Sequence, residues 1–251
     1  MIRRTLVITD NARLADFFPA FIAQSELCEY ISLACSPRAP AVVLSNEAFD
    51  VVDVRKESPR LSREYQLIIS VHCKQLFPES LHERVECINI HPGYNPETRG
   101  WFPQVWAIAR GLKAGVTVHR IDDEIDHGDV IDRFVIPMRI WDTSKTAYDR
   151  ILAAEIAWIR KNFQRLVEGD YATCKLEQQG HLYTKNDFDS FCEIDLDRVG
   201  TFREFYDQLR ALSFDGHKNA YFIDPGSGAR IFLQLQIDPE AIDMNARDCA
   251  D

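Results

Sequence analysis

The feature that most constrains the fold of this chain is an alternation of short apolar segments with helical ones through its first two thirds. A helix is predicted directly after the first apolar segment, with Asp10 and Asn11 at its capping position, and another over 102–111. Strands that alternate with helices pair in parallel, so the pattern predicts an α/β fold with a doubly wound, mostly parallel sheet. The expected strands are 5–9, 30–35, 51–54, 67–71, 86–90, 116–121 and 130–136.

The pattern changes after a long amphipathic helix, which is predicted over 144–168 and ended by Gly169. Later segments are shorter: one helix over 202–212, then strands over 219–223 and 230–236 around a turn-rich Asp-Pro-Gly-Ser-Gly. We therefore predict a main domain over residues 1–170. A small C-terminal α+β subdomain with a hairpin is expected over 171–251, with the last dozen residues frayed.

Composition narrows the classes of function. A hydrophobic fraction of 46% can fill a core, and no apolar run is long enough to span a membrane or to serve as the core of a signal peptide, so we expect a cytoplasmic protein. The formal net charge of -10 and the lack of a long basic run argue against a nucleic-acid partner. Seven cysteines without a Cys-x-x-Cys pair are typical of reduced thiols.

The chemistry concentrates in the run Cys-Ile-Asn-Ile-His-Pro at 87–92 and in Asp126 of Ile-Asp-His-Gly-Asp. Asn89 and His91 are two residues apart at the carboxyl end of a predicted strand, so they share the face of an edge where open α/β sheets bind ligands. An amide N–H can stabilise a developing oxyanion, and an imidazole beside a carboxylate can donate a hydrogen bond or carry a proton. The three side chains suit acyl transfer without a nucleophilic side chain.

Two other interpretations stay open from the residues alone. Asn89 could simply cap a turn while His91 packs in a loop. The second interpretation is a metal site that catalyses hydrolysis. The histidines show neither the i, i+4 helical pairing nor the cysteine spacing of known metal sites, so we expect no metal. His119 alternates with valines on a strand and is expected to support Asp126. The residues considered as metal ligands are His72, His91, His119, His127, Asp126 and Asp129.

Four blocks in order, at 67–78, 89–92, 115–119 and 125–131, resemble the formyltransferases that use N10-formyltetrahydrofolate as co-substrate. The resemblance covers residues 1–170 and implies that this part is the catalytic domain. It also implies that Asn89, His91 and Asp126 are the catalytic residues. The folate pocket that it implies consists of Lys74, Gln75, Leu76 and Phe77 together with the loop that holds Asp122 and Asp123.

The run GYNPETRGWFP at 93–103 is similar to the sugar N-formyltransferases of this family. That similarity implies a nucleotide-linked amino sugar as acceptor. We expect dTDP-4-amino-4,6-dideoxy-D-glucose, used for a bacterial surface polysaccharide such as the O-antigen of lipopolysaccharide. Other acceptors stay open: GDP-perosamine, a dTDP-3-amino sugar or a ribonucleotide. A non-catalytic module that only binds nucleotide sugar or folate is a further alternative.

Three groups of residues are expected to contact the acceptor. In the first, Tyr94 and Trp101 can stack on a sugar or base, with Asn95, Arg99 and Gly100 beside them, although Trp101 could instead pack on the following helix. The second group could hold a phosphate at the start of the first helix. The third, near the C-terminal hairpin, could hold a base or phosphate, and this tail is also the expected interface of a homodimer. The second and third groups are Thr9, Asp10 and Asn11, and Lys218, Asn219 and Tyr221.

Overall fold

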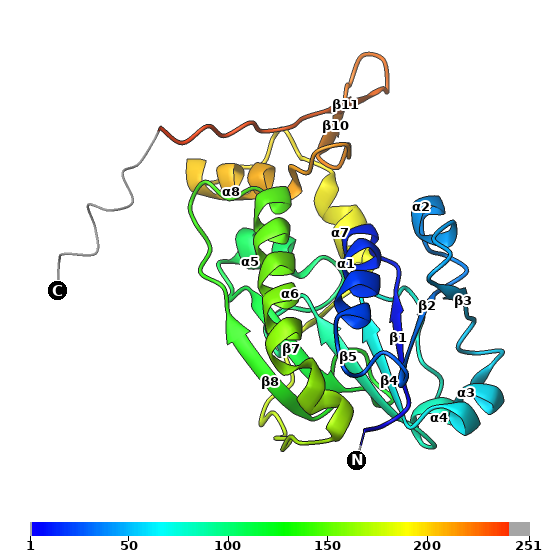
Figure 1. Cartoon of the computed structure of the whole chain (residues 1–251). Helices are drawn as coiled ribbons and strands as arrows, with labels where there is room; N and C mark the ends of the chain where they lie inside the picture. The colour runs from blue at the N-terminus through cyan, green and yellow to red at the C-terminus, as the bar shows by residue number, and fades with distance from the viewer. Residues whose placement is uncertain (1, 241–251) are drawn as a thin grey trace.

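A seven-stranded sheet forms the centre of the protein, in a computed structural model that describes residues 2–240 (Figure 1). The strand order is β3-β2-β1-β4-β5-β7-β8, with parallel pairing from β3 to β5 and antiparallel pairing of β7 with both β5 and β8. The predicted doubly wound, mostly parallel sheet is therefore confirmed. The fraying predicted for the chain end and Cys249 lie outside the described residues. The strands are β1 (Thr5–Thr9), β2 (Ile31–Cys35), β3 (Asp50–Val51), β4 (Leu67–Val71), β5 (Glu86–His91), β7 (Gly115–Arg120) and β8 (Val130–Val135).

The third strand differs from its prediction. The sequence predicts a strand over 51–54, whereas β3 pairs only over Asp50–Val51. Val52 and Val54 are buried in the core on one side of the sheet, which accounts for the apolar run, but they form no strand pairing with β2. An apolar run therefore reports burial, and pairing depends in addition on whether a neighbouring strand lies within reach.

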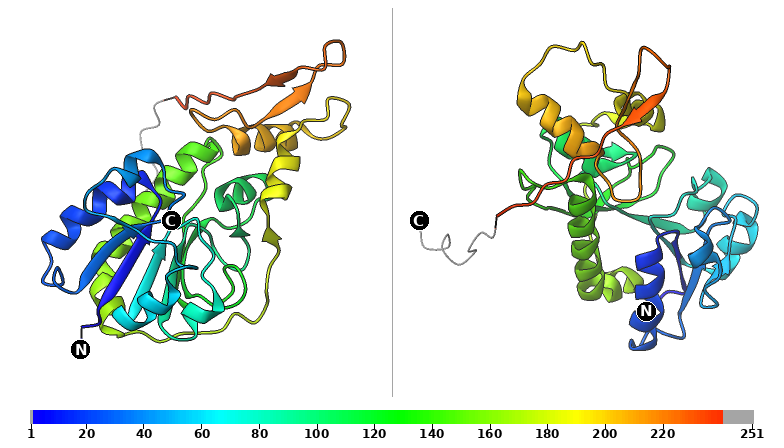
Figure 2. Two further views of the ribbon diagram at one scale, coloured as in Figure 1. Left: turned by 90° about the vertical axis from the view of Figure 1, so that its right-hand side faces the viewer. Right: turned by 90° about the horizontal axis from the view of Figure 1, so that it is seen from above.

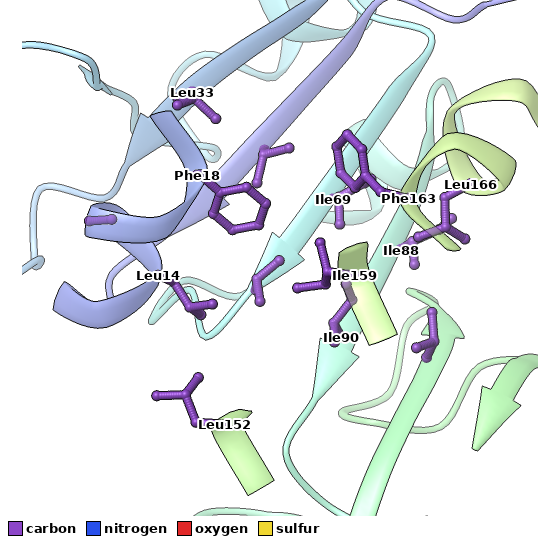
Figure 3. Close-up of a cluster of buried hydrophobic side chains, with 14 of the residues drawn as sticks. Leu14, Phe18, Leu33, Ile69, Ile88, Ile90, Leu152, Ile159, Phe163 and Leu166 are labelled. Atoms are coloured by element: carbon purple, nitrogen blue, oxygen red, sulfur yellow. The ribbon is translucent and has the colours of Figure 1, made fainter. Parts of the chain in front are cut away.

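Helices cover both faces of the sheet. The apolar stripes of α1 (Ala12–Ala23) and α6 (Ser144–Glu168) fill the larger core on one face, where Phe18 and Phe163 pack with ring centroids 6.3 Å apart (Figure 3). A capping box at Thr143 starts α6, and Gly169, with a φ of 77°, ends it where the sequence predicts. The smaller core on the other face includes residues of α3 (Ser58–Glu64) and α4 (Glu79–His82), and the short α2 (Ala41–Leu44) follows β2.

The C-terminal elements pack on α5 (Pro103–Arg110), and the hairpin lies apart from the central sheet (Figure 2). A third core joins Trp106 of α5 to Phe188 of α7 (Lys185–Cys192) and Leu212 of α8 (Phe202–Leu212). The predicted hairpin is present as β10 (Tyr221–Ile223) and β11 (Arg230–Phe232), shorter than expected. In addition β9 (Leu182–Tyr183) pairs with β6 (Arg99–Gly100), so the chain beyond residue 170 also contacts the loop after β5. The domain boundary at 170 stays a prediction.

The carboxyl ends of β1, β4 and β5 form the edge on which the candidate site is built. β1 and β4 are neighbours in the sheet, but the chain leaves β1 toward β2 and leaves β4 toward β5, on opposite sides. Ligands of open α/β sheets bind at such a switch point. Within residues 2–240, no helix combines the length and apolar character needed to cross a membrane.

Candidate active site

Asn89, His91 and Asp126 meet at the carboxyl end of β5. Asn89 and His91 project from the same face of the strand, and Asn89 Nδ2 donates to Asp126 Oδ1 over 3.1 Å. His91 Nδ1 lies 3.5 Å from Asp126 Oδ2. His119 of β7 stands opposite Asn89 in the strand register, with its Nε2 3.5 Å from Asp126 Oδ1. The structure therefore brings the predicted trio together and places His119 in the supporting position expected for it.

In each ring one nitrogen donates to a backbone carbonyl, so that nitrogen carries a proton. His91 Nε2 donates to the carbonyl of Thr98 over 3.1 Å, which leaves Nδ1 with its lone pair on the side of Asp126. His119 Nδ1 donates to the carbonyl of Arg120 over 2.7 Å, and its Nε2 lies 3.4 Å from Asn89 Nδ2 and 3.5 Å from Asp126 Oδ1. Asn89 Nδ2 contacts both Asp126 and His119, and the contact with His119 is the longer and therefore the weaker. A formyl oxygen can replace His119 as the partner of this N–H at the least cost.

Burial and charge act on the two ionisable members of the trio. Burial lowers the pKa of His91, and the nearby Asp126 and Thr98 carbonyl oppose this effect only in part. Burial would raise the pKa of Asp126, but the two histidines and the Gly100 N–H outweigh it, and the pKa lies well below its usual range. At neutral pH the site therefore holds an ionised carboxylate beside a neutral imidazole, which is ready to accept a proton.

We predict that Asp126→Asn lowers the pKa of His91 further. The Asp126 charge is the largest of the contributions that raise this pKa, so its removal leaves the lowering by burial less opposed. Nitrogen-15 spectra of the histidine rings, recorded across pH for both proteins, measure the shift, and the exposed His217 serves as internal control. A His91 titration that stays unchanged or moves to higher pH would contradict this account of the site.

The backbone at Asp126 has a left-handed conformation, with a φ of 49°, that costs about 1–3 kcal/mol for a residue other than glycine. Several groups of the 95–100 loop hold it there. Asn95 Nδ2 donates to the Asp126 carbonyl over 2.9 Å, and the Gly100 N–H donates to Asp126 Oδ2 over 2.9 Å. Arg99 Nη2 and Nε donate to the carbonyl of Ile125 over 2.7 and 3.2 Å.

Asn95, Arg99 and Gly100, which the sequence predicts as acceptor contacts, make these contacts within the protein. Arg99 is only 3% exposed, and its guanidinium donates hydrogen bonds to the Ile125 carbonyl and the Gln179 side chain. Asn95 is buried as well, so the structure gives these residues the task of holding Asp126. Tyr94 packs between the cationic groups of Lys113 and Arg133, 5.3 and 5.0 Å from its ring centroid. Trp101, at 48% exposure, is the residue of this run that presents a large aromatic surface.

Arg99→Met is predicted to lower both stability and turnover. The methionine leaves the Ile125 carbonyl without its two donors, which costs about 1–3 kcal/mol in the free energy of unfolding. The loop that holds Asp126 is then less constrained, and we expect kcat to fall about 100-fold. Urea unfolding and steady-state kinetics measure the two effects, with the exposed Arg63→Met as matched control. Wild-type kcat in the folded Arg99→Met protein would contradict the positioning role.

The predicted folate residues lie in two loops. Gln75 joins its loop to the segment after β3 through hydrogen bonds with the backbone of Val52 and Val54, 2.8 and 2.9 Å long. Leu76 is 55% exposed, whereas Phe77 is partly buried against the smaller core. In the other loop, Asp122 accepts from His127 over 2.7 Å and Asp123 lies 3.4 Å from His82 of α4. Lys74 is exposed, but its backbone N–H donates to Asp10 over 2.6 Å.

The residues predicted to hold a phosphate at the start of α1 are engaged within the protein. Asp10 is buried and accepts hydrogen bonds from Ser36 and Lys74, so a negative charge already occupies this helix start. Thr9 accepts from the Asn11 N–H, and Asn11 caps the helix. Like charges repel, so the Asp10 carboxylate disfavours a phosphate at this helix start, and the contact of these residues with the acceptor stays a prediction.

The C-terminal residues of the prediction come together in one place. Lys218, Asn219 and Tyr221 line a depression of about 430 Å³ with Arg230 and Phe232. The Arg230 guanidinium lies 4.6 Å from the centroid of the Tyr221 ring. The lining also includes Phe188 and the carboxylate of Asp189, which is paired with Lys185. Lys218 and Arg230 beside aromatic rings are suited to a phosphate and a base.

The sequence does not reveal some residues that shape the site. Thr98 orients His91 through a backbone carbonyl, which its side-chain type does not encode. Gly93 lies against the His91 ring, where a β-carbon would be 2.3 Å from Nε2. In the sequence, the sign of this close contact is the glycine that directly follows His91 and Pro92. In the described part of the chain, no cluster of three or more His, Cys, Asp or Glu residues could hold a metal ion.

Comparison with known proteins gives consistent matches. The sequence model described as formyl transferase matches residues 18–162, and that of the N-formyltransferase dimerization C-terminal domain matches 187–239. A dTDP-4-amino-4,6-dideoxyglucose formyltransferase of Mycobacterium tuberculosis is 40% identical over 188 residues, which cover 75% of this chain and 80% of that protein.

Two solved structures are similar along nearly the whole chain. A 4-N formyltransferase from Francisella tularensis has a TM-score of 0.87 at 33% identity and covers 95% of this chain and 99% of its own. A sugar N-formyltransferase from Shewanella has a TM-score of 0.89 at 32% identity, with 94% and 98% covered.

Proposed function

This chain belongs to the formyl transferase family, and we propose that it moves the formyl group of N10-formyltetrahydrofolate onto the amino group of dTDP-4-amino-4,6-dideoxy-D-glucose. The observation that carries the proposal is the convergence of Asn89, His91 and Asp126 at one strand end. The relative that is 40% identical supports the choice of acceptor. The intact trio argues against a module that only binds its ligands.

Each member of the trio has a distinct task in the transfer. Asn89 donates an N–H to the formyl oxygen as this becomes an oxyanion, and a donor of this kind is worth about 100-fold to 1000-fold in kcat. His91 accepts at Nδ1 the proton that the amine nitrogen loses on attack, then returns it to N10 as the bond from N10 to the formyl carbon breaks. Asp126 stabilises the imidazolium that exists between these two steps, since its carboxylate lies 3.5 Å from Nδ1.

The two loops beside the trio fit a flat, partly apolar ring system. Leu76 presents an exposed apolar side chain next to Phe77, and the contact between His82 and Asp123 joins this side to the 122–127 loop. We assign Lys74, Gln75, Leu76, Phe77, Asp122 and Asp123 to the folate side of the site. The co-substrate supplies the formyl carbon, and these residues would bind and orient it.

The acceptor side is assigned to Trp101 and to the depression formed by Lys218, Asn219 and Tyr221. In this proposal residues 1–170 are the catalytic domain, and 171–251 form a homodimer interface, a nucleotide pocket or both. The match of 187–239 to a dimerization domain supports the first role, and so do the exposed Phe202, Ile231 and Phe232. Light scattering at several protein concentrations would test the dimer.

Incubation with N10-formyltetrahydrofolate and a panel of amino acceptors tests the function. The panel holds dTDP-4-amino-4,6-dideoxy-D-glucose, a dTDP-3-amino sugar, GDP-perosamine and an amino-bearing ribonucleotide. Mass spectrometry should detect one added formyl group on the first acceptor, which would fit a cytoplasmic role in the synthesis of the O-antigen of lipopolysaccharide. A formyl group on another acceptor would reassign the sugar. Tight binding by calorimetry without any product would favour a binding module.

A further inference from the structure

A second group of polar side chains lies at the switch point of the sheet and has no task in the mechanism described above. It consists of Asn11 after β1, His72 after β4, and Tyr148 and Glu155 of α6. Glu155 is completely buried, and its Oε2 lies 2.8 Å from His72 Nε2. His72 Nδ1 lies 3.0 Å from the Tyr148 hydroxyl, which in turn is 2.6 Å from Asn11 Nδ2.

One arrangement of protons satisfies all the hydrogen bonds of this group. Asn11 Oδ1 accepts the capping hydrogen bond from the Leu14 N–H, so the amide must donate through Nδ2 to the Tyr148 oxygen. In this arrangement Tyr148 turns its own O–H toward His72 Nδ1, which accepts with its lone pair, and the ring proton at Nε2 is donated to Glu155. The result is a directed chain of hydrogen bonds from Asn11 to Glu155.

The place of His72 points to a function. In the register of the sheet Val71 pairs with Ile90, so His72 follows β4 as His91 ends β5, on neighbouring strands. His72 has a φ of 57°, a left-handed conformation that costs about 1–3 kcal/mol and is retained mostly at functional sites. Its side chain keeps 9% of its surface exposed, which allows a proton to pass on to water.

Glu155 is a buried carboxyl group with few hydrogen-bond donors. Its Oε1 is buried and has no hydrogen-bond partner within residues 2–240, so His72 is the donor that this carboxylate has. A buried charge with so few donors is stabilised strongly by an opposite charge at close range. Uptake of a proton by His72 at Nδ1 would supply that charge 2.8 Å away. Tyr148 is suited to pass the proton, because burial raises its pKa and keeps the hydroxyl protonated.

The proposed reaction needs such an acceptor. An amino sugar that arrives as an ammonium ion carries three N–H protons; one stays in the formamide, one goes to N10, and one is released. His91 carries the proton that N10 receives. We propose that Tyr148, His72 and Glu155 form a relay that removes the released proton from the acceptor ammonium group. The ammonium gives a proton to the Tyr148 oxygen, Tyr148 gives its own to His72 Nδ1, and Glu155 stabilises the imidazolium. This inference rests on the proposed function.

Three substitutions test the relay while preserving shape. Tyr148→Phe removes the hydroxyl, Glu155→Gln removes the charge, and His72→Asn keeps a residue that tolerates a positive φ but cannot take up the proton. Each is expected to lower kcat about 100-fold while KM for both substrates stays close to wild type. Wild-type kcat in the folded Tyr148→Phe or Glu155→Gln protein would overturn the relay, and so would a change confined to KM.

A fourth variant separates proton transfer from a merely structural role. His72→Gly relieves the strain at a φ of 57° and leaves a space the size of the lost ring. Added imidazole should restore much of its kcat, whereas it should not affect the wild type or Tyr148→Phe. A folded His72→Gly protein that imidazole does not rescue would overturn the proposal.

The resting arrangement can be tested without any turnover. Two-bond nitrogen-15 spectra of the wild-type protein should show His72 with its proton at Nε2 and an unprotonated Nδ1. A ring protonated at Nδ1, alone or in addition, would have no room for the incoming proton and would overturn the relay. Absence of formylation of every acceptor by the wild type would instead contradict the proposed function, so the two failures are distinguishable.

Discussion

Asp126→Asn, His91→Ala and Asn89→Ala are each expected to reduce kcat by orders of magnitude while the protein remains folded. Loss of the Asn89 donor should cost about 100-fold to 1000-fold, because the oxyanion is then less stabilised. Loss of His91 removes the group that moves a proton between the amine and N10, which is worth about 100-fold to 10,000-fold. Asparagine at 126 tolerates the left-handed backbone but lacks the charge that stabilises the His91 imidazolium.

Steady-state kinetics with both substrates, together with thermal unfolding, would measure these effects. The losses should appear in kcat, since the trio acts on the transition state, and the double variant of Asn89 and Asp126 should lose less than the product of the two single losses. Near-wild-type turnover in all three single variants would remove the assignment of the trio, whatever the substrate.

Gly93→Ala is expected to lower kcat about 100-fold through displacement of His91. A β-carbon at this position would lie 2.3 Å from His91 Nε2 and 2.6 Å from the Thr98 carbonyl, inside the contact that orients the ring. Gly93 has no left-handed backbone that would exclude alanine, so the cost comes from crowding and should be about 1–3 kcal/mol in stability. The ring would turn, and its Nδ1 would no longer face Asp126.

Gly226→Ala is the matched control for this prediction. Gly226 also lacks a left-handed backbone, and the nearest atom to a β-carbon there is Asp224 Oδ2 at 3.6 Å, an ordinary contact. Its kcat and unfolding free energy should stay close to wild type. If Gly93→Ala turned over as fast as this control, the orientation of His91 by Thr98 would not be needed for transfer.

Much of the fold could be predicted from the sequence because secondary structure leaves a local periodic signal. The predicted helices over 144–168 and 202–212 coincide with α6 and α8, which carry caps and apolar stripes that are visible residue by residue. The reversed direction of β7, which is antiparallel to both β5 and β8, could not be read from the alternation of strands and helices, because it depends on the path of the chain after α5.

The 93–103 run shows that residue type does not tell where a side chain points. Arg99 and Asn95 have side chains that commonly bind polar ligands, and the sequence offers no means of seeing which way they point. In the structure both point inward to the carbonyls of Ile125 and Asp126, two residues of a distant loop. A side chain in a loop is oriented by contacts that are remote in the sequence, so its role follows only from three-dimensional packing.

The sequence by itself determined that Asn89 and His91 share one face at the end of a strand, because side chains of a strand alternate with a period of two. It also provided, through the four blocks, the expectation that Asp126 joins them. Only the tertiary structure decided that Asp126 has a left-handed backbone, held by hydrogen bonds from Asn95 and Arg99 to the carbonyls of residues 126 and 125. The contact between His72 and Glu155 is likewise visible only in the structure. Periodicity is encoded locally, whereas strain and buried pairing depend on which distant groups the fold places within hydrogen-bond distance.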